Sequence, residues 1–246
     1  MLMNQFKRHS RAVAVFVVMT LLLTGSVACA NTAIEPTPRD DAGWMKRHEK
    51  MNARVAEGNV DLLYIGDSIT HGWEGGGKNV WAEYYGDRNA VNLGIGGDRT
   101  QHVLWRLENG NVDGISPKAA VLMIGTNNHK DNSPEEIGAG IIAVVDSLRA
   151  KLPDMKILIL AIFPRGEGPS KLRENMAEAS AIAATKADGD MVHYLDIGNE
   201  FLAEDSTLSK EVMPDLLHLN ESSYRTWAEA VEEKVAELMG ELVPTE

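Results

Sequence analysis

The chain has 246 residues, 36 of them acidic and 24 basic, which gives a formal net charge of −12. Hydrophobic residues make up 44% and charged residues 24%, so a wholly disordered, collagen-like or coiled-coil chain is excluded. The acidic balance argues against a nucleic-acid partner, because phosphate binding needs clustered Lys and Arg. One cysteine cannot form an internal disulfide, and no Cys/His cluster has the spacing of a zinc site.

The first thirty residues have the pattern of a secretory signal peptide. Basic residues within 1–11 precede an apolar run over 12–23, and the small-x-small motif Ala28-Cys29-Ala30 follows. The apolar run is shorter than the roughly 20 residues that span a bilayer. We predict a secreted or periplasmic protein, cleaved near Ala30, with no stable membrane span in the mature chain. Two alternatives stay open: an uncleaved N-terminal anchor, and a lipoprotein modified on Cys29.

The remaining chain alternates predicted helices with predicted strands. Residues 31–43, which include two prolines, are expected to form a short exposed leader. Apolar runs predict strands at 60–65, 90–93, 119–124, 156–163 and 191–195. Helical patterns with capping signals lie at 44–57, 100–108, 134–152, 170–186 and 222–238.

This alternation predicts an α/β fold. Repeated β-α units with apolar strands imply a parallel sheet that helices cover on both faces. No linker and no internal repeat follow residue 42, so the sequence predicts one domain. In such sheets ligands bind at the carboxyl ends of the strands. Candidate functional residues are therefore expected just after the strands.

Three strand ends and one late loop carry chemically useful residues. The segment 66–68, Gly-Asp-Ser, follows the first strand, where a serine at a helix or turn start lies near backbone N–H groups that stabilise an oxyanion. Glycines in 94–100 follow the second strand and allow close backbone approach to a ligand. The segment 125–128, Gly-Thr-Asn-Asn, offers a carboxamide donor after the third. Asp215 stands three residues before His218.

Each of these segments also has an ordinary structural interpretation. Serine after aspartate caps a helix, Gly-Gly and Asn-Asn form turns, and an isolated Asp-x-x-His is solvated. Their joint occurrence at successive strand ends, in this order, favours a functional site.

Other motifs are weaker. The segment 72–79 lacks the Ser/Thr of a phosphate-binding loop, and the other histidines share no metal spacing. Trp73 stays open as a residue that could line the entrance.

These motifs resemble a known family. Gly66-Asp67-Ser68-Ile69 resembles the first block of the GDSL/SGNH hydrolases, with isoleucine for the usual leucine, and the later motifs match the second, third and fifth blocks. The stretches GIGGDRTQHVLWRLENG, GTNNH, FPRG and DLLHL resemble the platelet-activating-factor acetylhydrolase Ib catalytic-subunit branch and its bacterial relatives. The resemblance spans roughly 44–238. It implies a single flavodoxin-like three-layer α/β/α domain over 44–240, with about five parallel strands and a tail over 241–246.

The resemblance also implies a serine esterase mechanism. Ser68 would be the nucleophile, His218 the general base and then acid, and Asp215 the group that orients the imidazole. The oxyanion hole would comprise the Ser68 N–H, the Gly97 N–H and the Asn127 side-chain amide. No metal and no organic cofactor is expected.

The same branch places the acyl group against three further positions, which here are Ile69, Thr126 and Leu217. Bulky side chains beside catalytic residues predict short-acyl substrates, acetyl above all, on a carbohydrate or another small-molecule ester. The alternatives are a broader-chain esterase or lysophospholipase of the same family and a non-catalytic carbohydrate-binding protein on the same fold. A homodimer is left open.

Overall fold

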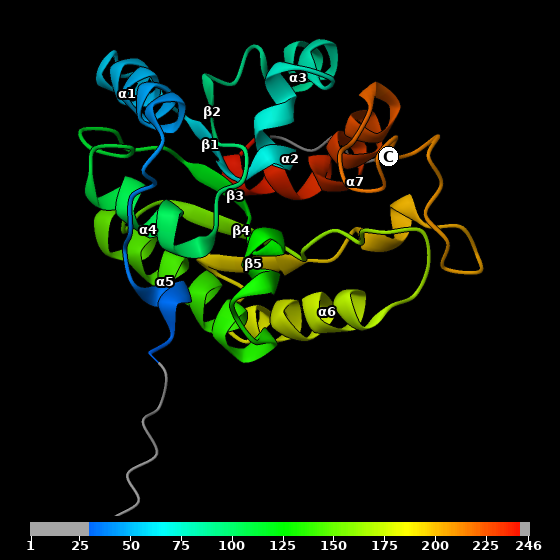
Figure 1. The fold of residues 1–246 in the computed structure, drawn as a ribbon. Helices are drawn as coiled ribbons and strands as arrows, with labels where there is room; N and C mark the ends of the chain where they lie inside the picture. The colour runs from blue at the N-terminus through cyan, green and yellow to red at the C-terminus, as the bar shows by residue number, and fades with distance from the viewer. Residues whose placement is uncertain (1–29, 242–246) are drawn as a thin grey trace, which may run out of the picture. The chain divides into compact units, whose positions relative to one another are not determined.

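The computed structural model describes residues 30–241, and from Asn31 onward they form one compact unit. The predicted signal peptide up to Cys29 and the tail residues 242–246 lie outside the described residues. Five parallel strands form a single sheet in the order β2-β1-β3-β4-β5, which is the flavodoxin-like order (Figure 1). The strands are β1 (Leu62–Gly66), β2 (Ala90–Gly94), β3 (Ala119–Met123), β4 (Lys156–Leu160) and β5 (Val192–Leu195).

Helices cover both faces of this sheet, which confirms the predicted three-layer α/β/α fold (Figure 1). Leu63 and Ile65 of β1 pack on one face, whereas Leu62 and Tyr64 pack on the other. Because β1 is buried on both faces, it needs the continuous apolar run seen in the sequence. One face packs against α1 (Ala42–Ala56), α4 (Thr100–Glu108), α5 (Pro134–Lys151) and α6 (Lys171–Ala184), and the other against α3 (Lys78–Tyr85) and α7 (Glu221–Met239).

Local capping chemistry sets the ends of the longer helices. Ser133 and Glu136 form a capping box at the start of α5, with Pro134 as the first helical residue. The Asp41 carboxylate accepts the N–H groups of Gly43 and Trp44, so α1 begins at Ala42, two residues before the predicted start. These ends follow from signals only a few residues long.

Two helices beside the predicted site were missed from the sequence: α2 (Ser68–His71) and α3. Both are short, and the run of glycines at 75–77 masks the buried Val80 and Tyr85 that mark α3. Trp73 lies between them in a 3-10 turn (Gly72–Glu74) and is only 1% exposed, packed among the aromatic side chains of α3 and α7. It therefore belongs to the core and not to an entrance.

The leader expected over 31–43 is exposed for most of its length, but it is attached to the domain. Ala33, in a 3-10 turn (Thr32–Ile34), is fully buried, and its carbonyl accepts the Thr100 hydroxyl at 2.7 Å. Thr37 N–H donates to the Gln101 carbonyl at 3.1 Å. Proline content and polarity alone suggested exposure, but these tertiary contacts fix the segment on α4.

The strand order determines where a ligand can bind. The chain steps from β1 to β2 on one side and then returns to place β3 on the other side of β1. At such a reversal the loops leaving β1 and β3 diverge and open a crevice at the carboxyl ends of the strands. Ser68 follows β1 and Asn127 follows β3, so both residues flank this crevice.

Candidate active site

Ser68 is the first residue of the short helix α2, directly beyond β1. The carboxylate of Asp67 caps this helix by accepting the Ile69 N–H at 2.9 Å. Ser68 is half-buried, whereas Asp67 beneath it is fully buried. The cap thus holds the hydroxyl at the helix N-terminus, where backbone N–H groups favour negative charge.

Helix α7 fixes α2 on the same face of the sheet. The Tyr224 hydroxyl donates to the Ile69 carbonyl at 2.6 Å, across 155 residues of sequence. This approach requires glycine at position 72, because a Cβ there would lie 2.0 Å from the same hydroxyl. A four-residue helix that could not persist alone is thereby anchored at both ends.

His218 and Asp215 complete a hydrogen-bonded chain with Ser68. The Nε2 atom of His218 lies 2.9 Å from Ser68 Oγ, and its Nδ1 atom lies 2.6 Å from Asp215 Oδ2. Such a chain can pass a proton from the hydroxyl to the imidazole while the carboxylate fixes the tautomer. The three residues that the sequence proposed as a triad therefore meet at the crevice.

A tight turn presents the base. The second carboxylate oxygen of Asp215 accepts the N–H groups of Leu217 and His218 at 3.1 and 2.7 Å. Burial alone would raise the pKa of Asp215, but the donors from His218 outweigh it and keep that pKa below its ordinary value. Leu216 has a φ of 60°, an unusual value that its carbonyl contact with the Gly166 N–H, at 2.8 Å, helps to maintain.

The loop after β2 faces Ser68. Gly96 lies against the Ser68 side chain, and its N–H donates to His71 Nδ1 at 3.3 Å. Gly97 has a φ of 78°, which side-chain-bearing residues rarely adopt. The Asn127 amide donates to the Asp98 carbonyl at 2.9 Å, and its second N–H is left to serve another acceptor. Gly97 and Asn127 are thereby brought together at the loop.

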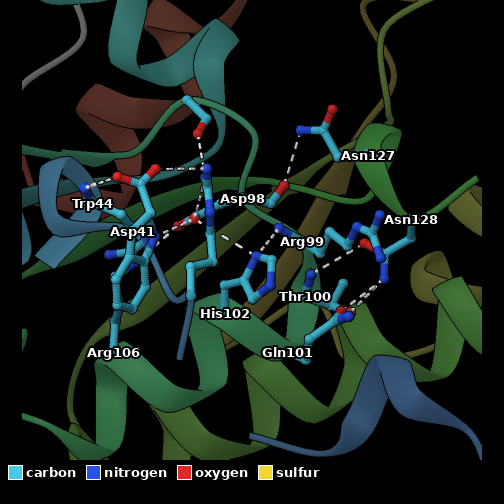
Figure 2. A network of polar contacts seen from close by, with 12 residues as sticks. Asp41, Trp44, Asp98, Arg99, Thr100, Gln101, His102, Arg106, Asn127 and Asn128 are labelled. Atoms are coloured by element: carbon cyan, nitrogen blue, oxygen red, sulfur yellow. Dashed lines mark hydrogen bonds and ion pairs between the residues drawn. The ribbon is translucent and has the colours of Figure 1, made fainter. Parts of the chain in front are cut away.

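A buried polar network supports this loop from below (Figure 2). The Asp98 carboxylate, fully buried, accepts Trp44 Nε1 at 2.6 Å and Nε of the fully buried Arg106 at 2.9 Å. At the far end of the loop, Asn128 Oδ1 accepts the Thr100 N–H at 3.1 Å. These bonds tie the loop to buried partners, and such a polar network favours one arrangement of the backbone.

The three acyl-site candidates differ in their surroundings. Ile69 and Thr126 are 1% and 0% exposed, and only Leu217 is half-exposed. Ile69 packs in the core beneath α7, whereas the Thr126 hydroxyl accepts Arg165 Nη1 at 3.2 Å. Ile69 and Thr126 are therefore fixed in the interior beside the catalytic positions, whereas Leu217 belongs to the exposed turn.

Several site residues were not found from the sequence. Arg165 contacts Thr126, and Asp67 is strongly perturbed: burial, reinforced by the nearby Asp98 carboxylate, raises its pKa to about 7 despite the Ile69 N–H. Arg39, from the leader, donates to the Gly96 carbonyl at 2.6 Å. Arg165 and Asp67 each lie in a quoted motif, FPRG and Gly-Asp-Ser-Ile, whereas no motif marks Arg39.

Between residues 30 and 241 no group of three or more His, Cys, Asp or Glu side chains is arranged to hold a metal ion. In the same part of the chain, no helix combines the length and apolar character needed to cross a membrane.

Comparisons with known proteins identify the family. Residues 64–226 match the model of the GDSL-like lipase/acylhydrolase family. Subunit alpha1 of human platelet-activating factor acetylhydrolase IB is 35% identical over 219 residues, which cover 86% of this chain and 92% of that protein.

Two solved structures share the fold at lower identity. A catalytic mutant of an acetylxylan esterase from Geobacillus stearothermophilus has a TM-score of 0.58 and 18% identity, covering 77% of this chain and 98% of that one. A carbohydrate acetylesterase from Sinorhizobium meliloti has a TM-score of 0.55 and 18% identity, covering 73% and 100%. The family match and the human relative confirm the resemblance noted in the sequence. The chain therefore belongs to the GDSL-like lipase/acylhydrolase family of serine ester hydrolases.

Proposed function

We propose that this chain hydrolyses short-acyl carboxylic esters, acetyl esters above all, through an acyl intermediate on Ser68. The observation that carries the proposal is the hydrogen-bonded chain from Ser68 Oγ through His218 to Asp215. Ser68 attacks the ester carbonyl while His218 Nε2 takes its proton and then delivers it to the leaving alkoxide. Water then attacks the acyl-serine, with His218 again acting as base.

The developing oxyanion needs donors that are fixed before the reaction. The N–H groups of Ser68 and Gly97 and the second N–H of Asn127 are assigned this role. The Asp98 carbonyl already engages one Asn127 hydrogen at 2.9 Å, which orients the other. Losing one such donor commonly lowers turnover about 10²–10³-fold.

Short acyl chains are favoured because the walls beside the catalytic residues are filled. Ile69 and Thr126 are almost entirely buried, so neither can yield to a longer chain without disturbing Ser68 or Asn127. Each added methylene then meets steric resistance in place of the usual ~0.8 kcal/mol gained on burial. The names of the two esterases that share the fold support an acetylated carbohydrate as the natural ester.

An acyl-length series tests the proposal. We expect p-nitrophenyl acetate to be cleaved with a higher kcat/KM than the butyrate and the octanoate to be barely cleaved, all dependent on Ser68. Rates on octanoate equal to those on acetate would instead support the broader esterase or lysophospholipase. Failure of a fluorophosphonate to label Ser68, together with no turnover, would support the non-catalytic binding protein.

Leu217 offers a sharper version of this test, because it is the one wall residue with exposed surface. Leu217→Ala should raise the butyrate-to-acetate ratio of kcat/KM by opening space. Leu216→Ala, the same change one residue earlier on the turn, is the matched control and should leave that ratio unchanged. Equal ratios in both variants would show that Leu217 does not bound the acyl site.

We also propose export with cleavage near Ala30, on the strength of the N-terminal sequence pattern. Asn31 begins the compact unit: its side chain accepts the Ala33 N–H at 2.9 Å and donates to the Glu136 carbonyl at 3.4 Å. Sequencing of exported protein should start at Asn31. A lipid-modified N-terminal Cys29 would favour the lipoprotein instead.

A further inference from the structure

The segment before α1 is held across the domain as a strap, defined here as residues 31–41. The buried Ala33 and the Thr37 N–H attach it to α4, and Asp41 joins it to α1 as the helix cap. Figure 1 shows this segment in blue, running past α5 and α4 to the start of α1. The strap is thus fixed on both sides of Arg39, the one basic residue that it contains.

Arg39 reaches the loop that carries the oxyanion donor. Its Nη1 atom donates to the Gly96 carbonyl at 2.6 Å and lies 3.8 Å from the buried Asp98 carboxylate. Its Nη2 atom donates to Asp41 at 3.2 Å, so the guanidinium is held from two directions. The side chain is 27% exposed, which leaves its charge only partly screened by water. A Cβ on Gly97 would lie 3.1 Å from Nη1, so the guanidinium also lies directly against Gly97.

The contact at Gly96 fixes the direction of the Gly97 N–H. A carbonyl and the following N–H share one planar peptide unit and point in opposite directions when the bond is trans. No peptide bond in residues 30–241 is cis. The guanidinium that binds the Gly96 oxygen on the strap side therefore turns the Gly97 N–H away from the strap. Glycines on both sides of this unit would otherwise let it rotate freely.

The charge of Arg39 also favours the Gly97 N–H as a donor, in addition to the orientation that its hydrogen bond imposes. A cation on the carbonyl oxygen polarises the peptide unit and strengthens the N–H at its other end as a donor. A neutral donor at that oxygen would orient the peptide with less polarisation. Lysine would retain the charge without the planar fork that engages Gly96 and Asp41 together.

We infer that Arg39 is a positioning residue of the oxyanion hole, which it orients through the Gly96–Gly97 peptide, so that the N-terminal strap is part of the catalytic apparatus. The inference rests on the proposed function, because it assumes that the Gly97 N–H binds the oxyanion. Arg39 itself contacts neither the nucleophile nor the acyl group. Its loss should therefore lower kcat and leave KM almost unchanged.

Arg39→Ala, Arg39→Lys and a matched control test the inference in the exported enzyme, which retains the whole strap. We expect Arg39→Ala to lower kcat about 10–100-fold, less than the loss of a whole donor, with KM within about twofold of the wild type. Arg39→Lys should recover only part of kcat. Millimolar methylguanidine should raise kcat of Arg39→Ala without affecting the wild type, a readout that general destabilisation would not produce.

Arg54→Ala is the control, because Arg54 also donates to loop carbonyls, those of Gly58 and Asn59, but before β1 at the opposite end of the strands. It should lower the melting temperature as much as Arg39→Ala does while leaving kcat unchanged. If Arg39→Ala kept the full kcat of the wild type, with turnover still dependent on Ser68, the inference about Arg39 would be overturned. The proposed function would be unaffected. An increase in KM confined to esters with an anionic alcohol half would also overturn it, by showing substrate contact. Absence of Ser68-dependent turnover in the wild type would instead overturn the proposed function.

Discussion

The two sides of the active site are held in place by different means. On the oxyanion side, the supporting Asp98 and Arg106 are fully buried and pair with each other, and Asp98 also accepts Trp44 Nε1 from 54 residues away. On the base side, the side chains of His218 and Asp215 are 42% and 57% exposed, and the Asp215 carboxylate closes their turn by accepting the N–H groups of Leu217 and His218.

This difference follows the chemistry of each side. Oxyanion donors act through fixed position, so they gain from a rigid and dry support. The histidine must accept and release protons, and an exposed turn allows that exchange with water. Variants on the oxyanion side should therefore act through geometry, whereas variants on the base side should act through proton transfer.

The largest effect should come from removing a member of the hydrogen-bonded series Ser68–His218–Asp215, which joins the two sides. Ser68→Ala and His218→Ala should each lower kcat by about 10⁴–10⁶-fold on p-nitrophenyl acetate, because neither residue can act without the other. The double variant should be hardly slower than either single variant. Losses that multiplied in the double variant would contradict a shared role; circular dichroism checks that each variant folds.

Variants of Asn127 and Asn128 distinguish a donor to the oxyanion from a residue that supports the loop. Asn127→Ala should lower kcat about 10²–10³-fold, because it removes a donor from the oxyanion. Asn128→Ala is the paired comparison: Asn128 is fully buried and accepts the Thr100 N–H, so this variant should mainly lower the melting temperature. If Asn127→Ala reduced stability more than kcat, Asn127 would belong to the scaffold and not to the oxyanion hole.

Asp215 should matter less than a buried triad carboxylate, because its exposure screens its charge. We expect Asp215→Asn to lower kcat about 10–100-fold, far less than the roughly 10⁴-fold typical of a buried triad aspartate. Asparagine also keeps the oxygen that accepts the Leu217 and His218 N–H groups, so Asp215→Ala should be slower than Asp215→Asn. Equal rates in the two variants would show that the turn does not depend on that cap.

The last effect concerns the pH dependence of stability on the buried side and leaves turnover aside. Burial raises the pKa of Asp67 to about 7 from an ordinary value of 3.8, so between these values the folded state holds a proton that the unfolded state has lost. Its contribution to stability should thus be full below about pH 4, fall by about 1.4 kcal/mol per pH unit as pH rises toward 7, and level off above. Asp67→Asn keeps a neutral cap for Ile69 and should remove this slope.

The measurement is the free energy of unfolding of the wild type minus that of Asp67→Asn from pH 5 to 9. Taking the difference cancels the other titrating groups. Parallel profiles for the two proteins would show that Asp67 does not gain its proton in this range.

The sequence by itself determined the sheet, the longer helices and the residues that meet at the crevice. These signals are local: β1 and β3 are short apolar runs, and the capping box of α5 lies within four residues. Ser68 and Asn127 could be placed because each directly follows a strand, and parallel strands bring their carboxyl ends to one edge.

Tertiary structure alone decided how these residues are held. Arg39 meets Gly96 across 57 residues and Tyr224 meets Ile69 across 155, and no pattern of neighbouring residues encodes such contacts. The role of Trp73 as core and the attachment of the strap have the same origin. Local periodicity reports which face of an element is apolar, but it cannot report which distant segment covers that face, because that depends on the path of the whole chain.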